Sequence, residues 1–315
     1  MKFIVLGTTE FTLNCARSLI DAGNDVCALV SIFEHLTPLN SADIKGFAKA
    51  NGILYHEVED INSPAAVNFL KSLEPDFIFS SWPKIFKKDV LSIPKRFCIG
   101  SHPTDLPYNR GRHPLHWLIA LGHPDTKVSF FKMDEGVDSG NLLLQIPLMI
   151  EPSDKIDKVV DKMNTAAYAG LKQLSKKLVE DPLYEGKKQD HEKANYWRKR
   201  SVHDTVLDMR MSADAIVRTV RSFSLPYLCA KLIFKEHILN IVHAQIVETY
   251  LSPEEIKRME PGKIMNKEDK RIRVKVDDGI VELECDKDLP RDLLATQYIH
   301  PPTKYMIEWP KNLFK

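Results

Sequence analysis

The chain has 315 residues, of which 43% are hydrophobic and 28% are charged, and its Lys plus Arg (44) nearly balance its Asp plus Glu (43). This is ordinary globular usage and excludes a fibrous, low-complexity or intrinsically disordered chain. The near-neutral balance gives no overall field that would draw the chain to nucleic acid. The five cysteines are scattered without CxxC spacing, so we expect neither a metal site nor a disulfide framework.

The first residues run directly into an apolar segment, Phe3–Leu6, without a basic lead. No apolar run approaches the ~20 residues that a bilayer requires. We therefore expect a cytoplasmic protein without a membrane partner.

Short apolar runs alternate with longer amphipathic stretches over the first half of the chain. The runs predict buried strands at 3–6, 26–30, 53–55, 77–79, 97–99 and 128–131. Two well-marked helices are expected at 113–121 and at about 154–178. Apolar strands separated by helices predict a doubly wound, mostly parallel α/β sheet, with ligand sites outside the carboxyl ends of the strands.

A polar stretch at 185–200 predicts an exposed linker, which gives a catalytic domain at 1–184 and a second domain at 201–315. The second domain begins with a predicted helix at 213–223. Period-two segments follow at 228–234, 238–247 and 271–284. They predict a small β-rich, OB-like barrel domain.

Two polar segments follow predicted strands and carry most of the chemical information. The first runs Ile-Gly-Ser-His-Pro-Thr-Asp-Leu-Pro-Tyr-Asn-Arg-Gly over 99–111, and the second runs Met-Asp-Glu-Gly-Val-Asp-Ser-Gly over 133–140. The first resembles the Asn-x-His-x-Ser-Leu-Leu-Pro-x-Tyr-Arg-Gly loop of 10-formyltetrahydrofolate-dependent formyltransferases, and the second resembles their Asp-x-Gly loop. The spacing from the histidine to Arg110 and Gly111 matches without a gap.

The resemblance extends over most of the chain, through 3–11, 80–91 and 196–230. It implies a Rossmann-like formyltransferase fold and 10-formyltetrahydrofolate as the formyl donor. The stretch from Arg110 to Trp117 is most similar to the formyltransferase domain that modifies a nucleotide-linked aminoarabinose. We therefore expect the acceptor to be the primary amine of a nucleotide-linked amino sugar.

The chemistry of formyl transfer explains why a histidine and a carboxylate are wanted. The amine must lose a proton while it attacks the formyl carbon, and the departing folate nitrogen must gain one. Histidine side chains exchange protons near neutral pH. We predict that His102 is the catalytic base and that Asp138, from a loop after the next strand, holds its imidazole.

The chain departs from the family pattern at Gly100, which stands where the pattern has an asparagine. The side-chain amide expected to face the oxyanion is missing, and such a loss typically costs ~10²–10³ in rate. Ser101, the Asn109 amide or backbone N–H groups near Gly100 are the candidate replacements.

The resemblance also implies folate-binding residues. They are predicted to line the pterin pocket, to contact the folate or to close the pocket, and they are Lys84, Ile85, Phe86, Arg112, Asp134, Glu135, Gly136 and Val137. Trp82 is a candidate for stacking on the pterin.

Several residues have a structural interpretation of equal weight. Asp105, His113 and His116 line the substrate site or cap the entry of the next helix. The basic cluster of this region is more typical of a solvated helix face than of a phosphate site, and it comprises Lys84, Lys87, Lys88, Lys95 and Arg96. Gly7 lacks the further glycines of a dinucleotide loop, which argues against a nicotinamide oxidoreductase.

Three alternatives stay open. The first is a methionyl-tRNA formyltransferase, which is disfavoured because residues 201–315 hold equal numbers of basic and acidic side chains. The second is a folate- or nucleotide-binding homologue impaired in catalysis, suggested by Gly100. The third and weakest is a hydrolase that deformylates the cofactor. The sequence does not decide whether the chain forms a homodimer.

Overall fold

The computed structural model describes residues 1–36 and 41–308, and the chain divides into two compact units. Unit 1 comprises residues 1–114, 125–149 and 161–197, and unit 2 comprises 115–124, 150–160 and 198 onward. Within the described ranges, no helix combines the length and the apolar character that crossing a membrane would require.

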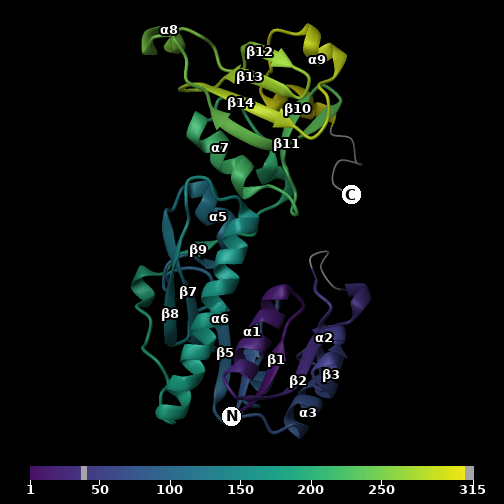
Figure 1. The fold of residues 1–315 in the computed structure, drawn as a ribbon, viewed down its shortest axis with the longest axis vertical. Helices are drawn as coiled ribbons and strands as arrows, with labels where there is room; N and C mark the ends of the chain where they lie inside the picture. Colours follow the sequence, from purple (N-terminus) through teal and green to yellow (C-terminus); the bar gives the residue numbers. More distant parts are fainter. Residues whose placement is uncertain (37–40, 309–315) are drawn as a thin grey trace. The chain divides into compact units, whose positions relative to one another are not determined.

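Unit 1 is built on a seven-stranded sheet with the order β3-β2-β1-β4-β5-β7-β8 (Figure 1). Its strands are β1 (Lys2–Leu6), β2 (Asp25–Ile32), β3 (Leu54–Val58), β4 (Phe77–Ser80), β5 (Phe97–His102), β7 (Asp125–Lys132) and β8 (Leu142–Met149). Neighbours from β3 to β5 pair in parallel, whereas β7 runs antiparallel to β5 and to β8. The predicted mostly parallel sheet is confirmed.

The central strands bury both of their faces, as a parallel sheet covered by helices requires. In β1, Phe3 and Val5 pack into one core with α1 (Glu10–Asp21), α2 (Ile44–Ala50) and α6 (Ile156–Glu180). Ile4 and Leu6 pack into the other core with α3 (Pro64–Ser72) and α4 (Lys88–Leu91). Because β1, β4 and β5 run parallel, their carboxyl ends lie at the same edge of the sheet.

Unit 2 contains a five-stranded antiparallel sheet with the order β10-β11-β14-β13-β12. Its strands are β10 (Ala230–Phe234), β11 (His237–Ile246), β12 (Ile264–Glu268), β13 (Arg271–Lys275) and β14 (Ile280–Cys285). The helix α7 (Ala213–Ser222) packs Ile216 and Val220 into the core of this sheet. The predicted β-rich C-terminal domain is confirmed as an antiparallel sheet.

The remaining elements are short. They are η1 (Glu34–Leu36), β6 (Arg110–Gly111), α5 (Pro114–Leu121), η2 (His191–Lys193), β9 (Tyr196–Trp197), η3 (Val202–Thr205), α8 (Pro253–Lys257), α9 (Arg291–Ala295) and η4 (Pro302–Glu308).

The polar stretch predicted as a linker is mostly exposed, but it does more than connect. Gln189 and Arg200 are buried, and β9 pairs with β6 inside unit 1. The residues up to Trp197 belong to unit 1. The stretch at 185–200 therefore packs beside the polar segment at 99–111 through the pairing of β9 with β6. The predicted domain boundaries stay a prediction.

Candidate active site

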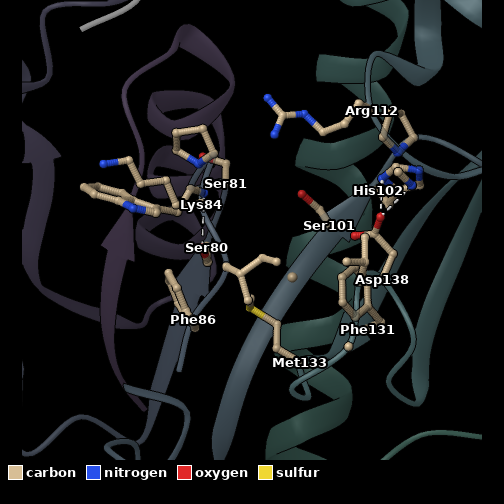
Figure 2. A pocket seen from close by; sticks show the side chains of 18 of the residues that line it. Ser80, Ser81, Lys84, Phe86, Ser101, His102, Arg112, Phe131, Met133 and Asp138 are labelled. Carbon is tan, nitrogen blue, oxygen red and sulfur yellow. Dashed lines mark hydrogen bonds and ion pairs between the residues drawn. The ribbon is translucent and has the colours of Figure 1, made fainter. Parts of the chain in front are cut away.

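A cavity of about 610 Å³ lies in unit 1 where β4 and β5 end. Figure 2 shows His102 and Asp138 on one side of it and Lys84 and Phe86 on the opposite side. The position agrees with the general rule that sites in α/β sheets form outside the carboxyl ends of the strands.

Most of the predicted site residues line this one cavity. They are Lys84, Ile85, Phe86, Gly100, Ser101, His102, Arg112, Asp134, Gly136, Val137 and Asp138, together with Trp82. Of the residues predicted for catalysis and for folate binding, Glu135 falls outside this lining. Segments far apart in the sequence therefore meet around a single volume, and the roles of the individual residues remain predictions.

His102, at the end of β5, is 5% exposed, and its Nδ1 lies 3.5 Å from Asp138 Oδ2. Its other ring nitrogen, Nε2, lies 2.9 Å from the backbone carbonyl of Asn109. A carbonyl oxygen can only accept a hydrogen bond, so Nε2 must carry the hydrogen in the neutral ring. Nδ1 is left with a free lone pair beside a carboxylate, which is the arrangement of a base with a group ready to stabilise its protonated form.

Asp138 is fixed at both its carboxylate and its backbone. Its Oδ2 accepts a hydrogen bond of 3.0 Å from the Gly111 N–H, and its backbone carbonyl accepts one of 2.9 Å from Gln189 Nε2. Its φ of 52° lies in the left-handed region, which aspartate tolerates better than most residues. The surrounding contacts therefore hold an otherwise unfavourable backbone conformation that directs the carboxylate to His102.

Gly100 leaves a space that the ring of Phe131 fills. A Cβ atom added at Gly100 would lie 2.6 Å from Phe131 Cζ and 3.0 Å from Met133 Cγ. Phe131, on β7, pairs with Gly100 across the sheet and is 5% exposed. An asparagine side chain at position 100 would need the volume that these two side chains occupy.

The three residues for which the sequence allowed either a substrate-site or a helix-capping role, Asp105, His113 and His116, lie outside the cavity lining. Asp105 forms an ion pair with Lys127 at 3.1 Å and accepts a hydrogen bond from Gln145 Nε2. His116 belongs to unit 2, where its Nδ1 bonds to the Ser222 carbonyl at 2.6 Å. His113 has a φ of 54° at the entry of α5. These contacts favour their structural interpretation.

The basic cluster does not gather around one anion site either. Arg96 stacks over Phe77 and Phe97 and donates to backbone carbonyls of Leu178 and Tyr184. Lys84 lines the cavity and its Nζ lies 3.5 Å from the Glu59 carbonyl oxygen, so the cluster is divided between different surroundings.

Sequence reasoning missed two residues that hold the polar segments. Asn195 Oδ1 accepts a bond from the Asn109 N–H at 2.8 Å, and its Nδ2 donates to Asn109 Oδ1 at 3.0 Å. Gln189 contacts the Asp138 loop as described above. Both lie in the stretch predicted as a linker, and the only signal for them was two amide side chains within a run of charged residues.

The cavity walls fit a flat ring system with polar edges. Phe86, Phe131 and Met133 provide apolar cover, and the buried Trp82 Nε1 has no hydrogen-bond partner among residues 1–36 and 41–308. A buried donor without a partner is costly unless a ligand or water satisfies it. A pterin has the shape and the edge acceptors that such walls require.

Comparisons with known proteins identify the family. The model of the formyl transferase family matches residues 1–174, and that of the formyl transferase C-terminal domain matches 199–287. A methionyl-tRNA formyltransferase of Caldanaerobacter subterraneus is 26% identical over 305 residues, covering 95% of this chain and 96% of the relative. One of Ehrlichia canis is 29% identical over 290 residues, covering 89% and 90%.

Solved structures share the fold at lower identity. The N-formyltransferase of Helicobacter canadensis, in complex with folinic acid and dTDP-3-aminofucose, matches with a TM-score of 0.67 at 14% identity, covering 90% of this chain and 99% of that one. WlaRD, a sugar 3N-formyl transferase in the presence of dTDP and 5-N-formyl-THF, matches with a TM-score of 0.65 at 14% identity, covering 92% and 99%. With a family model over more than half of its length, the chain belongs to the formyl transferase family.

Proposed function

We propose that this formyltransferase moves the formyl group of 10-formyltetrahydrofolate, the formyl donor of its family, onto the primary amine of a nucleotide-linked amino sugar. The observation that carries the proposal is the pairing of His102 Nδ1 with Asp138 at the wall of one cavity. The pair supports transfer to an amine, and the choice of a sugar rests on the further arguments below.

The imidazole performs both proton transfers. His102 Nδ1 takes the proton that the amine loses as its nitrogen bonds to the formyl carbon. Asp138 then faces the imidazolium across 3.5 Å, a distance that can shorten when substrates exclude water. The same nitrogen gives its proton to the folate nitrogen as the carbon–nitrogen bond to the folate breaks, so His102 ends the cycle neutral.

Ser101 is the candidate donor to the formyl oxygen. The Asn109 amide is bonded to Asn195 and lies outside the cavity lining. The backbone of Gly100 pairs with Ser80 on one side and Phe131 on the other, so its polar groups face the neighbouring strands. The Ser101 hydroxyl faces the cavity (Figure 2), and no hydrogen bond to it occurs within the described parts of the chain.

Arg112 is the candidate contact for an anionic part of a substrate. Its side chain is exposed, lines the cavity and extends across it in Figure 2. No carboxylate of the described residues forms an ion pair with it. Its guanidinium is therefore available to a carboxylate or a phosphate.

The charge distribution favours a sugar nucleotide over tRNA as the acceptor. An enzyme that binds tRNA needs a basic face to neutralise several phosphates. Residues 201–315 hold equal numbers of basic and acidic side chains, and several of the basic ones are paired within unit 2, including Arg210 with Asp208 and Arg273 with Glu282. Two formyltransferases that share the fold are the Helicobacter canadensis enzyme in complex with dTDP-3-aminofucose and WlaRD, a sugar 3N-formyl transferase.

Methionyl-tRNA is the second candidate acceptor. Sequence relatives with that name match almost the full length of the chain, including both family regions. The two acceptors make opposite predictions for salt, because displacement of counterions makes tRNA binding fall steeply with ionic strength.

The test is a direct assay of the acceptor. The protein is incubated with 10-formyltetrahydrofolate and either a panel of dTDP- and UDP-linked amino sugars or initiator tRNA charged with methionine, and the products are examined by mass spectrometry for an added formyl group. We expect transfer to at least one amino sugar, with KM nearly independent of salt. Transfer to methionyl-tRNA alone would reverse the choice, and His102→Asn is the control that removes transfer to any acceptor.

A further inference from the structure

Gln189 lies in the stretch predicted as a linker, yet it is only 5% exposed and uses its entire amide group. Its Nε2 donates to the backbone carbonyl of Asp138 at 2.9 Å and to that of Gly140 at 2.7 Å. Its Oε1 accepts a hydrogen bond of 2.6 Å from Arg110 Nη2. A primary amide has two N–H donors and one carbonyl oxygen, so every polar atom of this side chain is used.

The group that donates to the side-chain oxygen of Gln189 is the buried guanidinium of Arg110. Arg110 is 1% exposed, and it forms no ion pair with a carboxylate of the described residues. It donates instead to neutral acceptors: Gln189, the Tyr196 hydroxyl at 2.9 Å and His191 Nδ1 at 3.2 Å. A buried cation is costly without such partners, so the loss of one acceptor disturbs the segment that carries Arg110.

Two connections therefore join the Asp138 loop to β6. The Gly111 N–H holds the Asp138 carboxylate at 3.0 Å, while Gln189 joins Arg110 to the backbone of Asp138 and Gly140. The bond between Gly111 and Asp138 depends on the bonds of Gln189. The left-handed backbone at Asp138 must be held in place for its carboxylate to reach both Gly111 and His102.

We infer that Gln189 is a positioning residue for formyl transfer, which holds the Asp138 loop against Arg110 and Gly111 and so keeps the Asp138 carboxylate directed at His102 Nδ1. The inference rests on the proposed function of this site. Gln189 acts through Asp138 and lies outside the cavity lining, so it affects turnover and not the binding of substrates.

The exchange Gln189→Glu separates the two ends of the amide. The carboxylate still accepts from Arg110, but it has no N–H to donate and stands against the carbonyl oxygens of Asp138 and Gly140. Loss of a supporting contact of this kind typically lowers activity by ~10–100-fold, so we expect kcat to fall by that factor with KM unchanged. Gln173→Glu makes the same chemical change at an exposed position of α6 and should leave kcat at the wild-type value.

A double-mutant cycle with Asp138→Asn distinguishes positioning from general destabilisation. If Gln189 acts through Asp138, adding Gln189→Glu to Asp138→Asn lowers kcat no further. Independent, multiplicative losses in kcat, or a rise in KM with kcat preserved, would overturn the inference. Gln189→Met, which keeps the volume and removes all three bonds, replaces Gln189→Glu if that variant does not fold, and must show the same non-additivity.

A crystal structure of the Gln189 variant separates this inference from the proposed function. If the wild-type protein formylates neither amino sugars nor methionyl-tRNA, the proposed function fails whatever Gln189 does. The inference is then decided by geometry alone: displacement of the Asp138 carboxylate from His102 supports it, and an unchanged pair refutes it.

Discussion

Gly100→Ala tests the packing that distinguishes this site from the family pattern. The new Cβ would lie 2.6 Å from Phe131 Cζ, although carbon atoms in contact normally lie about 3.5–4.0 Å apart. The ring must therefore move by roughly 1 Å in a buried position. Overpacking of this kind costs about 1–3 kcal/mol of unfolding free energy. For a unit of this size the cost corresponds to a fall in Tm of roughly 2–12 °C.

The assay is thermal unfolding of four proteins: wild type, Gly100→Ala, Phe131→Leu and the double variant. Because the clash is with the ring, Gly100→Ala should cost much less in the Phe131→Leu background. Gly279→Ala is the control, since its Cβ meets nothing closer than Ala213 Cβ at 3.4 Å. Equal costs of Gly100→Ala in both backgrounds, or an unchanged Tm in the first, would refute the view that Phe131 occupies this space.

The same clash decides how the missing amide could be restored. Gly100→Asn alone forces the ring aside and should lower both stability and turnover. Combined with Phe131→Leu, the asparagine gains space, and we expect kcat above that of Phe131→Leu alone, by up to ~10²-fold if the amide reaches the formyl oxygen.

Three further outcomes are expected. His102→Asn should lower the rate constant of formyl transfer in a single-turnover assay by ~10²–10⁴-fold, whereas His35→Asn, at an exposed position, should leave it unchanged. Ser101→Ala should lower kcat by roughly 10²-fold with KM unchanged, and an unaffected rate would remove Ser101 as the oxyanion donor. In unit 2, the hydrogen bonds from Arg198 hold the pKa of the Asp204 carboxyl well below its usual range against the opposing effect of burial. A lowered carboxyl pKa stabilises the fold above the unfolded pKa of about 3.9, so Asp204→Asn should lower Tm at pH 7, and its difference from wild type should shrink as the pH falls below about 4.

The fold was largely predictable because its strongest signals are local. The buried runs at 77–79 and 97–99 fall inside β4 and β5, and the amphipathic stripe at 154–178 falls on α6 almost to its ends. The direction of β7 was not predictable, since an apolar run has the same composition in a parallel or an antiparallel strand. The strand β8 was missed although most of its residues are apolar, because Gln145 and Pro147 interrupt them and a proline argues against a strand interior.

The candidate site was predictable where a motif carries it. His102 and Asp138 were identified from two segments, and the structure brings their side chains to 3.5 Å. The contacts that hold them were not predictable. Gln189 and Asn195 come from a polar stretch whose composition is that of an exposed connection, and only the pairing of β6 with β9 shows that it packs beside the histidine loop.

The departure at Gly100 is a consistent change of packing and not an isolated loss. A side chain at position 100 and the ring of Phe131 compete for one volume, so a glycine at the first position is what allows a phenylalanine at the second. A member of the family with asparagine at the first position must therefore have a smaller or differently placed side chain at the second. With the amide gone and its space filled by carbon, formyl transfer needs another polar group for the oxyanion, and we propose the hydroxyl of Ser101, the adjacent residue of β5, because it lines the cavity.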